Sequence, residues 1–287
     1  MANSLAGRIA VITGASRGIG RAATLALAKQ GCDVVVTAKS TQEQEGLEGT
    51  IFSVADEAEA LGVRALPFQL DVRDSDRVAD MVSTVVKELG APGVVLCNAS
   101  ALWWKPIEQT PMSRYDLIHS INSRGTFAVT QACLPHMREA GWGHVITQSP
   151  PLVLDKLAGM TAYYSSKFGM TLTALGVAQE YRGRGVAGNA IWPTTLVESA
   201  AVRNHELGDA KLWRKADVLT DAIVSIASED PNNFSGHALL DEPYLRSKGV
   251  TDFEKYQCVP GHEPPKLDEV AELIMGAGDK SIASRNK

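Results

Sequence analysis

The sequence lacks the features that mark secreted, metal-binding and membrane-spanning proteins. No apolar run is long enough to cross a bilayer, and the first five residues carry no basic segment of the kind that opens a signal peptide. We therefore expect no membrane association. The 287 residues include only four cysteines, which form no C-x-x-C pair and no metal-ligand spacing: Cys32, Cys97, Cys133 and Cys258. Reduced thiols, no bound metal and a cytoplasmic location are the expectations that follow.

Acidic residues also outnumber basic ones. Lys and Arg number 28 against 33 Asp and Glu, which gives a formal net charge of -5, and the basic residues form no block. Nucleic acid and anionic membrane surfaces attract basic patches, so neither is an expected partner. The partner that remains is a small molecule.

Apolar segments of strand length alternate with segments of helical periodicity along most of the chain. This alternation predicts a doubly wound α/β fold of the Rossmann type, in which helices cover both faces of a parallel sheet. The predicted strands are Ile9–Thr13, Asp33–Thr37, Arg64–Leu70, Gly93–Cys97, His144–Thr147, Val186–Ile191 and Ala238–Leu240. The predicted helices are Gly20–Gln30, Ile51–Leu61, Ser75–Leu89, Ser113–Ala140, Thr161–Tyr181 and Ala216–Ser228.

The alternation stops at Asp241, which predicts a single α/β domain over residues 1–241. Residues 242–287 are a C-terminal extension that is rich in proline, with a predicted amphipathic helix at Leu267–Met275 and a polar tail. Three aromatic residues of the extension are candidates to cover a pocket or to form a subunit interface: Tyr244, Phe253 and Tyr256.

A glycine-rich turn separates the first predicted strand from the first predicted helix. Its glycines follow the spacing Gly14-xxx-Gly18-x-Gly20. Glycine lets the backbone approach an anion closely, and the N-terminus of the helix offers unpaired N–H groups and a partial positive charge. The turn is therefore a predicted site for the phosphates of a dinucleotide, formed by Thr13, Gly14, Ser16, Arg17, Gly18, Ile19 and Gly20.

The end of the second predicted strand indicates which dinucleotide binds. An acidic residue there would accept hydrogen bonds from the ribose 2′-hydroxyl of NAD and would repel the 2′-phosphate of NADP. The chain instead has Lys39 and Ser40, and Arg17 adds a second cation from the glycine-rich turn. Either charge alone is common on a solvated surface, but the pair at these two places favours NADP(H).

Two further strand ends carry polar side chains. Asp71 follows the third predicted strand and can accept a hydrogen bond from the adenine amino group, with the Val72 backbone beside it. Asn98 follows the fourth strand and can join adjacent loops, while Ala99 leaves room for the ribose. We expect all four residues to contact the cofactor.

A Tyr-x-x-x-Lys pair is the candidate catalytic feature. Tyr163 and Lys167 lie four residues apart in a strong helical pattern, so their side chains share a face of the helix. A nearby ammonium stabilises tyrosinate and lowers the phenol pKa, which prepares the hydroxyl for proton transfer. Tyr244 and Lys248 have the same spacing but follow Pro243 outside any clear helix, so Tyr163 and Lys167 are the preferred pair.

These motifs, taken in order and together with Asn122, resemble those of the short-chain dehydrogenase/reductase family over roughly residues 5–241. More narrowly, the segments Ser149-Pro150-Pro151 and Trp192-Pro193-Thr194-Thr195 are similar to a hydroxysteroid dehydrogenase-like branch of that family. The resemblance implies an NADP(H)-dependent oxidoreductase that interconverts a ketone or aldehyde and an alcohol.

The resemblance also implies roles for individual residues. Tyr163 gives or takes the substrate proton, and Lys167 holds the nicotinamide ribose and tunes Tyr163. Asn122 opens its helix locally and holds a water that links Lys167 to solvent; asparagine is unfavourable inside a helix, which agrees with a special role. The loop after the sixth strand contacts the nicotinamide carboxamide and diphosphate through Pro193, Thr195 and the Val197 backbone.

Two positions depart from the family pattern. The usual catalytic serine lies thirteen residues before the tyrosine, where this chain has Pro150, which has no hydrogen-bond donor. Ser149 is adjacent, and the two prolines after it can redirect the loop, so Ser149 is the candidate donor to the substrate carbonyl. Thr194 stands where the family often has glycine.

These residues bear on three candidate functions. Trp103 and Trp104 begin the family's substrate loop, residues 194–207 correspond to its mobile lid, and the aromatic residues favour an apolar carbonyl or alcohol. Pro150 leaves open a dinucleotide-binding sensor or scaffold with little turnover, although the intact Tyr163 and Lys167 argue against it. A dehydratase or epimerase is disfavoured because the chain lacks a separate substrate domain.

Two long predicted helices carry apolar residues on more than one face. They are Ser113–Ala140 and Thr161–Tyr181, and a helix with two apolar faces needs a second partner. In the family these helices pair across a two-fold axis, so we expect a homodimer or homotetramer.

Overall fold

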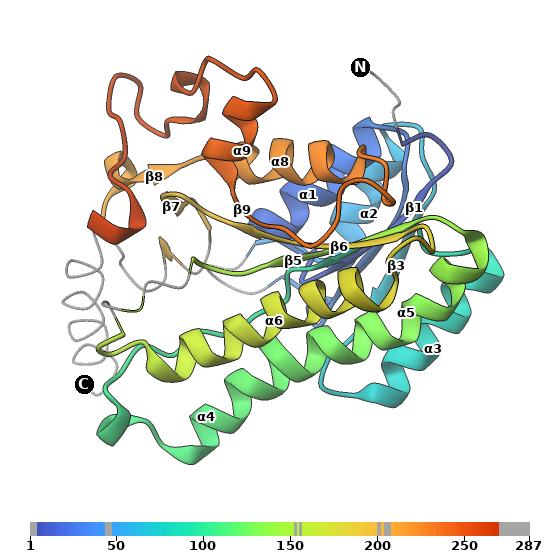
Figure 1. Ribbon diagram of the computed structural model, residues 1–287, viewed down its shortest axis with the longest axis horizontal. Helices are drawn as coiled ribbons and strands as arrows, with labels where there is room; N and C mark the ends of the chain where they lie inside the picture. Colours follow the sequence, from blue (N-terminus) through green and yellow to red (C-terminus); the bar gives the residue numbers. More distant parts are fainter. Residues whose placement is uncertain are drawn as a thin grey trace.

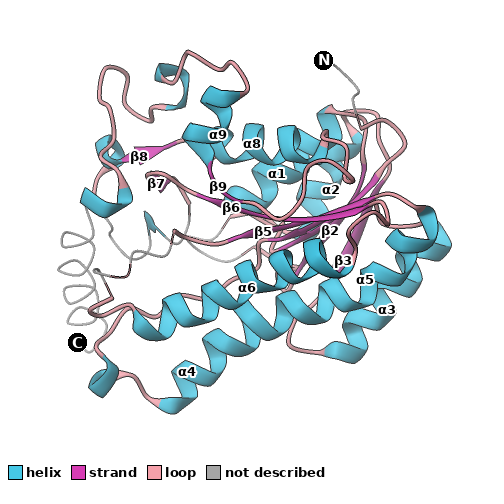
Figure 2. Ribbon diagram, viewed as in Figure 1, coloured by secondary structure: helices cyan, strands magenta, loops and turns pink. Residues whose placement is uncertain are grey.

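A sheet of seven parallel strands runs through the described part of the molecule, which is a computed structural model of residues 5–43, 48–151, 154, 157–199, 202–203 and 208–269. The strand order is β3-β2-β1-β4-β5-β6-β9, and helices cover both faces of the sheet (Figures 1 and 2). The strands are β1 (Ile9–Thr13), β2 (Asp33–Ala38), β3 (Ala65–Gln69), β4 (Val94–Cys97), β5 (Gly143–Gln148), β6 (Val186–Trp192) and β9 (Ala238–Leu240).

The predicted α/β fold is confirmed, and each predicted strand begins and ends within one residue of the observed one. The reason is that a parallel sheet covered on both faces buries nearly every strand residue, so its strands are continuous apolar runs. All five residues of β1 and all four of β4 are buried.

The helices form two layers, each packed against its own apolar core. On one face lie α1 (Gly18–Lys29), α2 (Ile51–Glu59), α8 (Asp217–Ala227) and α9 (Asp241–Ser247). On the other lie α3 (Ser75–Glu88), α5 (Thr126–Ala140) and α6 (Thr161–Glu180), with α4 (Met112–His119) extending past the sheet (Figure 1). None of the helices in the described residues combines the length and apolar character needed to cross a bilayer.

The predicted helix Ser113–Ala140 is one residue longer at its start and is not regular throughout. It is divided into α4, a π-helical segment at Ser120–Gly125 and α5. A π-helix has wider turns than an α-helix, is rare, and frequently lies at a functional site. Asn122 lies inside this segment and is fully buried, so the expectation that it opens its helix locally agrees with the structure.

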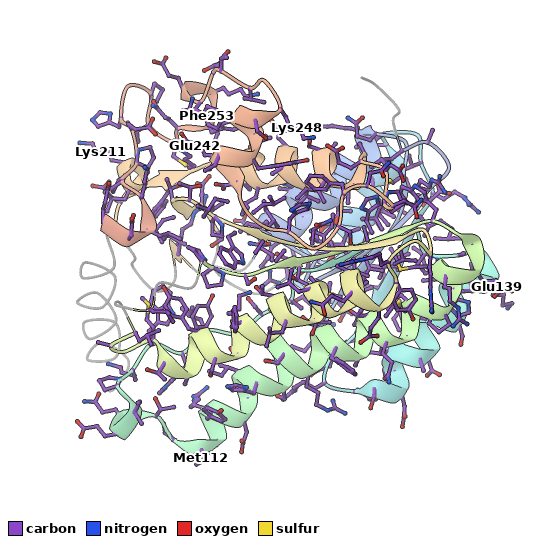
Figure 3. The ribbon with its side chains drawn as sticks, viewed as in Figure 1. Met112, Glu139, Lys211, Glu242, Lys248 and Phe253 are labelled. Carbon is purple, nitrogen blue, oxygen red and sulfur yellow. The ribbon has the colours of Figure 1, made fainter. Side chains whose placement is uncertain are left out.

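The C-terminal aromatic residues do not cover a pocket or face a second subunit, which corrects the expectation for Tyr244, Phe253 and Tyr256. All three are at most 5% exposed and belong to the core on the α8 side of the sheet. Tyr256 donates a hydrogen bond to Asp221 of α8 at 2.6 Å. Figure 3 shows Phe253 on this side, with Glu242. An alternating pattern of strands and helices cannot predict this packing, because the segment contributes little regular structure.

A second, two-stranded sheet was not predicted. It pairs β7 (Leu196–Val197) with β8 (Trp213–Arg214), two residues each, which is too short for a periodicity to be visible. Part of the predicted lid, residues 200–201 and 204–207, lies outside the described residues. So does the predicted helix Leu267–Met275 beyond its first three residues, which are helical.

Candidate active site

Thr13 and Asn98 join the ends of β1 and β4, the point where the strand order reverses direction. The Thr13 hydroxyl accepts hydrogen bonds from the backbone N–H groups of Asn98 and Ala99, both at 3.0 Å. The Asn98 amide donates to the carbonyl oxygens of Thr13 (2.9 Å) and Gly14 (3.2 Å). Asn98 therefore holds adjacent loops together as predicted, and it does so at the place where open α/β sheets bind ligands.

The glycine-rich turn fits closely against β4 because its glycines have no side chain. Gly14 has a φ of 67°, and a Cβ there would lie 2.9 Å from Ala99 Cα. A Cβ on Gly20 would lie 2.2 Å from the Gly14 carbonyl oxygen. Helix α1 begins at Gly18, and its N-cap, Arg17, makes no side-chain cap hydrogen bond. The first N–H groups of α1 thus have no cap, and the turn fits a bound diphosphate.

The residues predicted to select NADP lie together. The Arg17 guanidinium donates to the Ser40 hydroxyl (2.9 Å) and to the Gly49 carbonyl (3.1 Å), and its Nε is buried without a partner among the described residues. Lys39 is exposed beside Ser40. A guanidinium, a hydroxyl and an ammonium at the end of β2 form a donor set suited to a phosphate.

Asp71 already has a partner. Its carboxylate accepts from the Arg73 side chain at 2.6 Å and from the Arg73 backbone N–H at 3.0 Å. The Arg73 hydrogen bond holds the pKa of Asp71 below its ordinary value. Val72 is buried against Gly125 of the π-helical segment, where a Cβ would lie 2.6 Å from Val72 Cγ2. The structure therefore gives both residues structural contacts at this edge of the sheet.

A cavity of about 170 Å³ opens at the carboxyl ends of the strands. It brings together residues that are far apart in sequence and that were predicted for catalysis or for cofactor binding: Ile19, Ser149, Tyr163, Lys167, Pro193, Thr195 and Val197. Trp104 also lines it and packs edge-on against the Tyr163 ring, with centroids 5.9 Å apart. Trp103 is not among the lining residues; it lies under the Arg114 guanidinium instead.

The electrostatics of the Tyr163–Lys167 pair differ from the expectation. Burial raises the pKa of the Tyr163 phenol, and the neighbouring Tyr164 raises it further, so in this structure no ammonium lowers it. Lys167 is 5% exposed, donates to the Gln148 carbonyl at 2.7 Å, and has its pKa lowered to about 7 by burial. Both groups are therefore shifted toward their neutral forms.

Asn122 connects three elements around the cavity. Its side-chain oxygen accepts from the Ala101 N–H (2.8 Å), and its amide donates to the Ala101 carbonyl (3.0 Å) and to the Ser166 hydroxyl (2.9 Å). The Ser166 hydroxyl in turn donates to the Tyr163 carbonyl at 2.7 Å. Asn122 thereby fixes the loop after β4 against the helical turn that carries Tyr163.

Ser149 is 1% exposed, although it is one of the residues around the cavity. Its hydroxyl lies 2.7 Å from the Thr171 hydroxyl, and the Trp192 indole N–H donates to it at 3.2 Å. Thr194 is held apart from the cavity, since its N–H donates to the buried Asp241 carboxylate at 2.9 Å.

The alternative pair, Tyr244 and Lys248, lies outside the cavity. The Tyr244 hydroxyl bonds with Ser225 of α8 at 2.9 Å, and Lys248 forms an ion pair with Glu229. Burial raises the pKa of Tyr244 to about 12. Both residues are occupied in attaching α9 to α8, which agrees with the choice of Tyr163 and Lys167.

Sequence reasoning missed several groups that shape the site. Gln148 ends β5 at the carboxyl edge, the same signal that identified Asp71 and Asn98, and could have been found in that way. Ala101 and Gly49 act through backbone atoms, which no residue type reveals. Leu267 reaches the cavity from the far end of the described chain, so only the fold places it there.

The comparisons with known proteins agree with this geometry. A family model described as short chain dehydrogenase matches residues 8–207, so the chain belongs to the short-chain dehydrogenase/reductase family of oxidoreductases. Members of this family bind a nicotinamide dinucleotide and act on small molecules.

Two curated relatives share the name hydroxysteroid dehydrogenase-like protein 2. The chain is 40% identical to the Rattus norvegicus protein over 263 residues, which are 90% of this chain and 49% of that protein. It is 38% identical to the Homo sapiens protein over 278 residues, covering 94% and 66%. The chain thus spans about half the length of the rat relative.

Two solved structures are similar in fold. A short chain dehydrogenase from Mycobacterium thermoresistibile has a TM-score of 0.85 at 42% identity, with 91% of this chain and 94% of that chain covered. A metagenomic short-chain oxidoreductase in complex with NADP has a TM-score of 0.70 at 26% identity, covering 83% and 97%.

Burial of Lys167 predicts a pH-dependent cost in stability. The pKa is 10.5 for an ordinary lysine and about 7 in the folded protein, so between these values the unfolded chain binds a proton that the folded chain does not. The contribution of Lys167 to the free energy of unfolding therefore falls as the pH drops from 10 to 7, and this contribution is constant below pH 7. As the pH is lowered from 10 to 7, we expect the free energy of unfolding of Lys167→Met to rise relative to that of the wild type. The measurement is urea unfolding of the protein without cofactor.

Lys87→Met is the matched control, because Lys87 is 82% exposed on α3. The difference in the free energy of unfolding between Lys87→Met and the wild type should not change with pH. If the corresponding difference for Lys167→Met is also constant between pH 7 and 10, the assignment of a lowered pKa to Lys167 is wrong.

Proposed function

We propose that the chain is an NADP(H)-dependent oxidoreductase that interconverts an apolar ketone or aldehyde and the corresponding alcohol, with Tyr163 as proton donor or acceptor. The observation that carries the proposal is the single cavity in which Tyr163 and Lys167 lie beside Ile19 of the glycine-rich turn and Thr195 of the loop after β6. A dinucleotide lying along that turn would reach the same space as the tyrosine hydroxyl.

The residues that would hold NADP(H) are those predicted from the sequence. The uncapped N-terminus of α1 would hold the phosphates, Arg17, Lys39 and Ser40 would hold the 2′-phosphate, and the loop at Pro193–Val197 would hold the nicotinamide. When bound, the nicotinamide supplies or accepts the hydride.

The proton chemistry belongs to Tyr163. Its raised pKa keeps the phenol protonated, and so suited to donate to the oxygen of a carbonyl that is being reduced. A charged Lys167 would stabilise the tyrosinate left behind. With a pKa of about 7, Lys167 can take up a proton near neutral pH and return it.

Ser149 is the proposed donor that polarises the substrate carbonyl, because Pro150 has none. The Thr171 hydroxyl and the Trp192 indole can both donate to Ser149, which leaves the serine proton free to face the cavity. If that proton is instead given to Thr171, the chain has no such donor, which favours the second candidate function, a dinucleotide-binding sensor with little turnover.

A homodimer or homotetramer is also part of the proposal. Phe127 of α5 and Leu172 of α6 are 58% and 54% exposed, and they lie at the same groove between these helices. Large apolar side chains gathered on adjacent helices mark a protein interface. The cytoplasm is the proposed compartment, supported by the four cysteines, all of which are free thiols.

Cofactor preference should depend on Lys39. Replacing it by Asp removes a charge-assisted contact, worth roughly 1.5–3 kcal/mol, and adds repulsion of the 2′-phosphate. We expect the ratio of NADPH to NADH affinity to fall at least about tenfold by titration calorimetry. Lys87→Asp, on remote α3, is the control. Equal affinity of the wild type for the two cofactors would refute the preference.

Turnover should depend on Tyr163. The Tyr163→Phe variant keeps the ring against Trp104 but loses the proton donor, so kcat should fall by at least ~10²–10⁴ while NADPH binding survives. Tyr244→Phe removes a hydroxyl that bonds with Ser225 of α8 outside the cavity, so it should leave kcat nearly unchanged. Activity that persists in Tyr163→Phe and disappears in Tyr244→Phe would show that the wrong tyrosine was chosen.

Loss of the Ser149 hydroxyl should lower kcat by roughly 10²–10³, the usual cost of one oxyanion-type donor, with little effect on NADPH affinity. The measurement is steady-state turnover of one ketone by the wild type and by Ser149→Ala. A change in kcat of less than about threefold, under half of a tenfold step on a logarithmic scale, would remove Ser149 from the catalytic residues.

Assembly should depend on the groove between α5 and α6. Light scattering at micromolar concentration should give the mass of a dimer or tetramer for the wild type and a smaller mass for Phe127→Asp, because a buried carboxylate opposes association. Phe52→Asp is the matched control, since Phe52 is 50% exposed on α2. A monomeric wild type would rule the interface out.

A further inference from the structure

A third apolar cluster lies apart from the two cores that cover the sheet. Buried Met160, Leu196, Val202 and Trp213 form it, and Leu267 and Trp104 pack against them. All of these except Trp213 also line the cavity that contains Tyr163. The cluster is therefore the apolar wall of the cavity, and Leu267 is the part of that wall that comes from the C-terminal extension.

Backbone contacts hold Leu267 in this wall. Its N–H donates to the Thr194 carbonyl at 2.9 Å, and Thr195 and Lys266 form an antiparallel bridge. The extension thus runs beside the loop that carries Pro193 and Thr195, and it meets the cavity next to the expected nicotinamide position.

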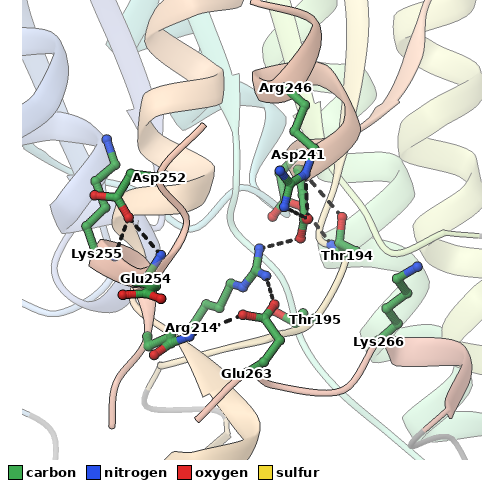
Figure 4. A network of polar contacts seen from close by, with 12 residues as sticks. Thr194, Thr195, Arg214, Asp241, Arg246, Asp252, Glu254, Lys255, Glu263 and Lys266 are labelled. Atoms are coloured by element: carbon green, nitrogen blue, oxygen red, sulfur yellow. Dashed lines mark hydrogen bonds and ion pairs between the residues drawn. The ribbon is translucent and has the colours of Figure 1, made fainter. Parts of the chain in front are cut away.

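Arg214 fixes the segment that leads to Leu267. It is 1% exposed, and its guanidinium donates to Glu263 (Figure 4). The same guanidinium donates to Glu242 of α9 at 2.6 Å and lies over the Phe253 ring. Gln257 donates to the other Glu263 oxygen at 3.2 Å. A buried guanidinium is costly to leave unpaired, so the Glu263 end of the extension is held in one place.

We propose that Leu267 is a specificity-determining residue of the cavity and that Arg214 is the positioning residue that holds it there through Glu263. This rests on the proposed function. Among the described residues that line the cavity, Lys167 is the one with an ionisable side chain other than the two tyrosines. The fitting substrate is therefore a neutral carbonyl compound whose apolar chain extends from Tyr163 to Leu267.

The first test compares Leu267→Ala and Leu267→Phe with the wild type on methyl ketones of increasing chain length, from 2-butanone to 2-undecanone, with NADPH. Truncation should raise KM for 2-undecanone about 5- to 30-fold, from the lost apolar contact, and leave 2-butanone within about twofold. Leu267→Phe should shorten the longest chain accepted. Leu61→Ala, 42% exposed at the end of α2, is the control.

A chain-length profile that does not change in either Leu267 variant would overturn the proposal. Binding of 2-undecanone is measured separately by tryptophan fluorescence, since Trp104 lines the cavity. If the wild type binds 2-undecanone but does not turn it over, the proposed function alone is overturned. The effect of the Leu267 variants on affinity is then measured by the same fluorescence titration. No binding to the wild type would overturn the inference itself.

The role of Arg214 is tested through Glu263, whose side chain is 61% exposed, so its replacement leaves the core intact. Glu263→Gln should raise KM for 2-undecanone about threefold to tenfold at unchanged NADPH affinity. If Glu263 acts through Leu267, the double variant with Leu267→Ala should be no worse than Leu267→Ala alone. Additive effects, or an equal effect from Glu88→Gln on α3, would overturn the positioning role.

Discussion

The spacing between the ends of β1 and β4 is the constraint on which the site depends. These strands are neighbours at the point where the sheet order reverses, and Thr13 and Asn98 hold their ends together through five hydrogen bonds. This connection holds the glycine-rich turn against Ala99, where Gly14 leaves no room for a Cβ, and α1 then begins at a fixed place relative to the cavity. The start of α1 in turn fixes the positions of the Arg17 and Ile19 side chains.

A second constraint acts inside the cavity, where burial opposes ionisation. The pKa of Tyr163 is raised and that of Lys167 is lowered, so the charged form of each group is costly in free energy. The Gln148 carbonyl accepts a hydrogen bond from the Lys167 side chain, which compensates in part for the burial of that group. The protonation of both groups therefore responds strongly to any further charge or dipole placed beside them.

The sequence predicts the sheet well and the outer wall of the site poorly, for physical reasons. Strands buried on both faces must be apolar throughout, and a phosphate turn needs its glycines, so both leave local patterns. The wall at Leu267 depends on a buried Arg214 that meets Glu263 almost fifty residues later, and no local pattern encodes that contact. The aromatic residues Tyr244 and Phe253 were misplaced because an aromatic side chain indicates burial without indicating which cavity or core receives it.

The π-helical segment has a consequence for how the chain can vary in length. Its wider turns accommodate one residue more than a regular helix would between α4 and α5. Deleting a single residue here would allow the two helices to fuse and would rotate Asn122 by about 100° away from Ala101 and Ser166. The chain should therefore accept insertions and deletions in its exposed loops but not in this one turn, where the register of the backbone is itself part of the site.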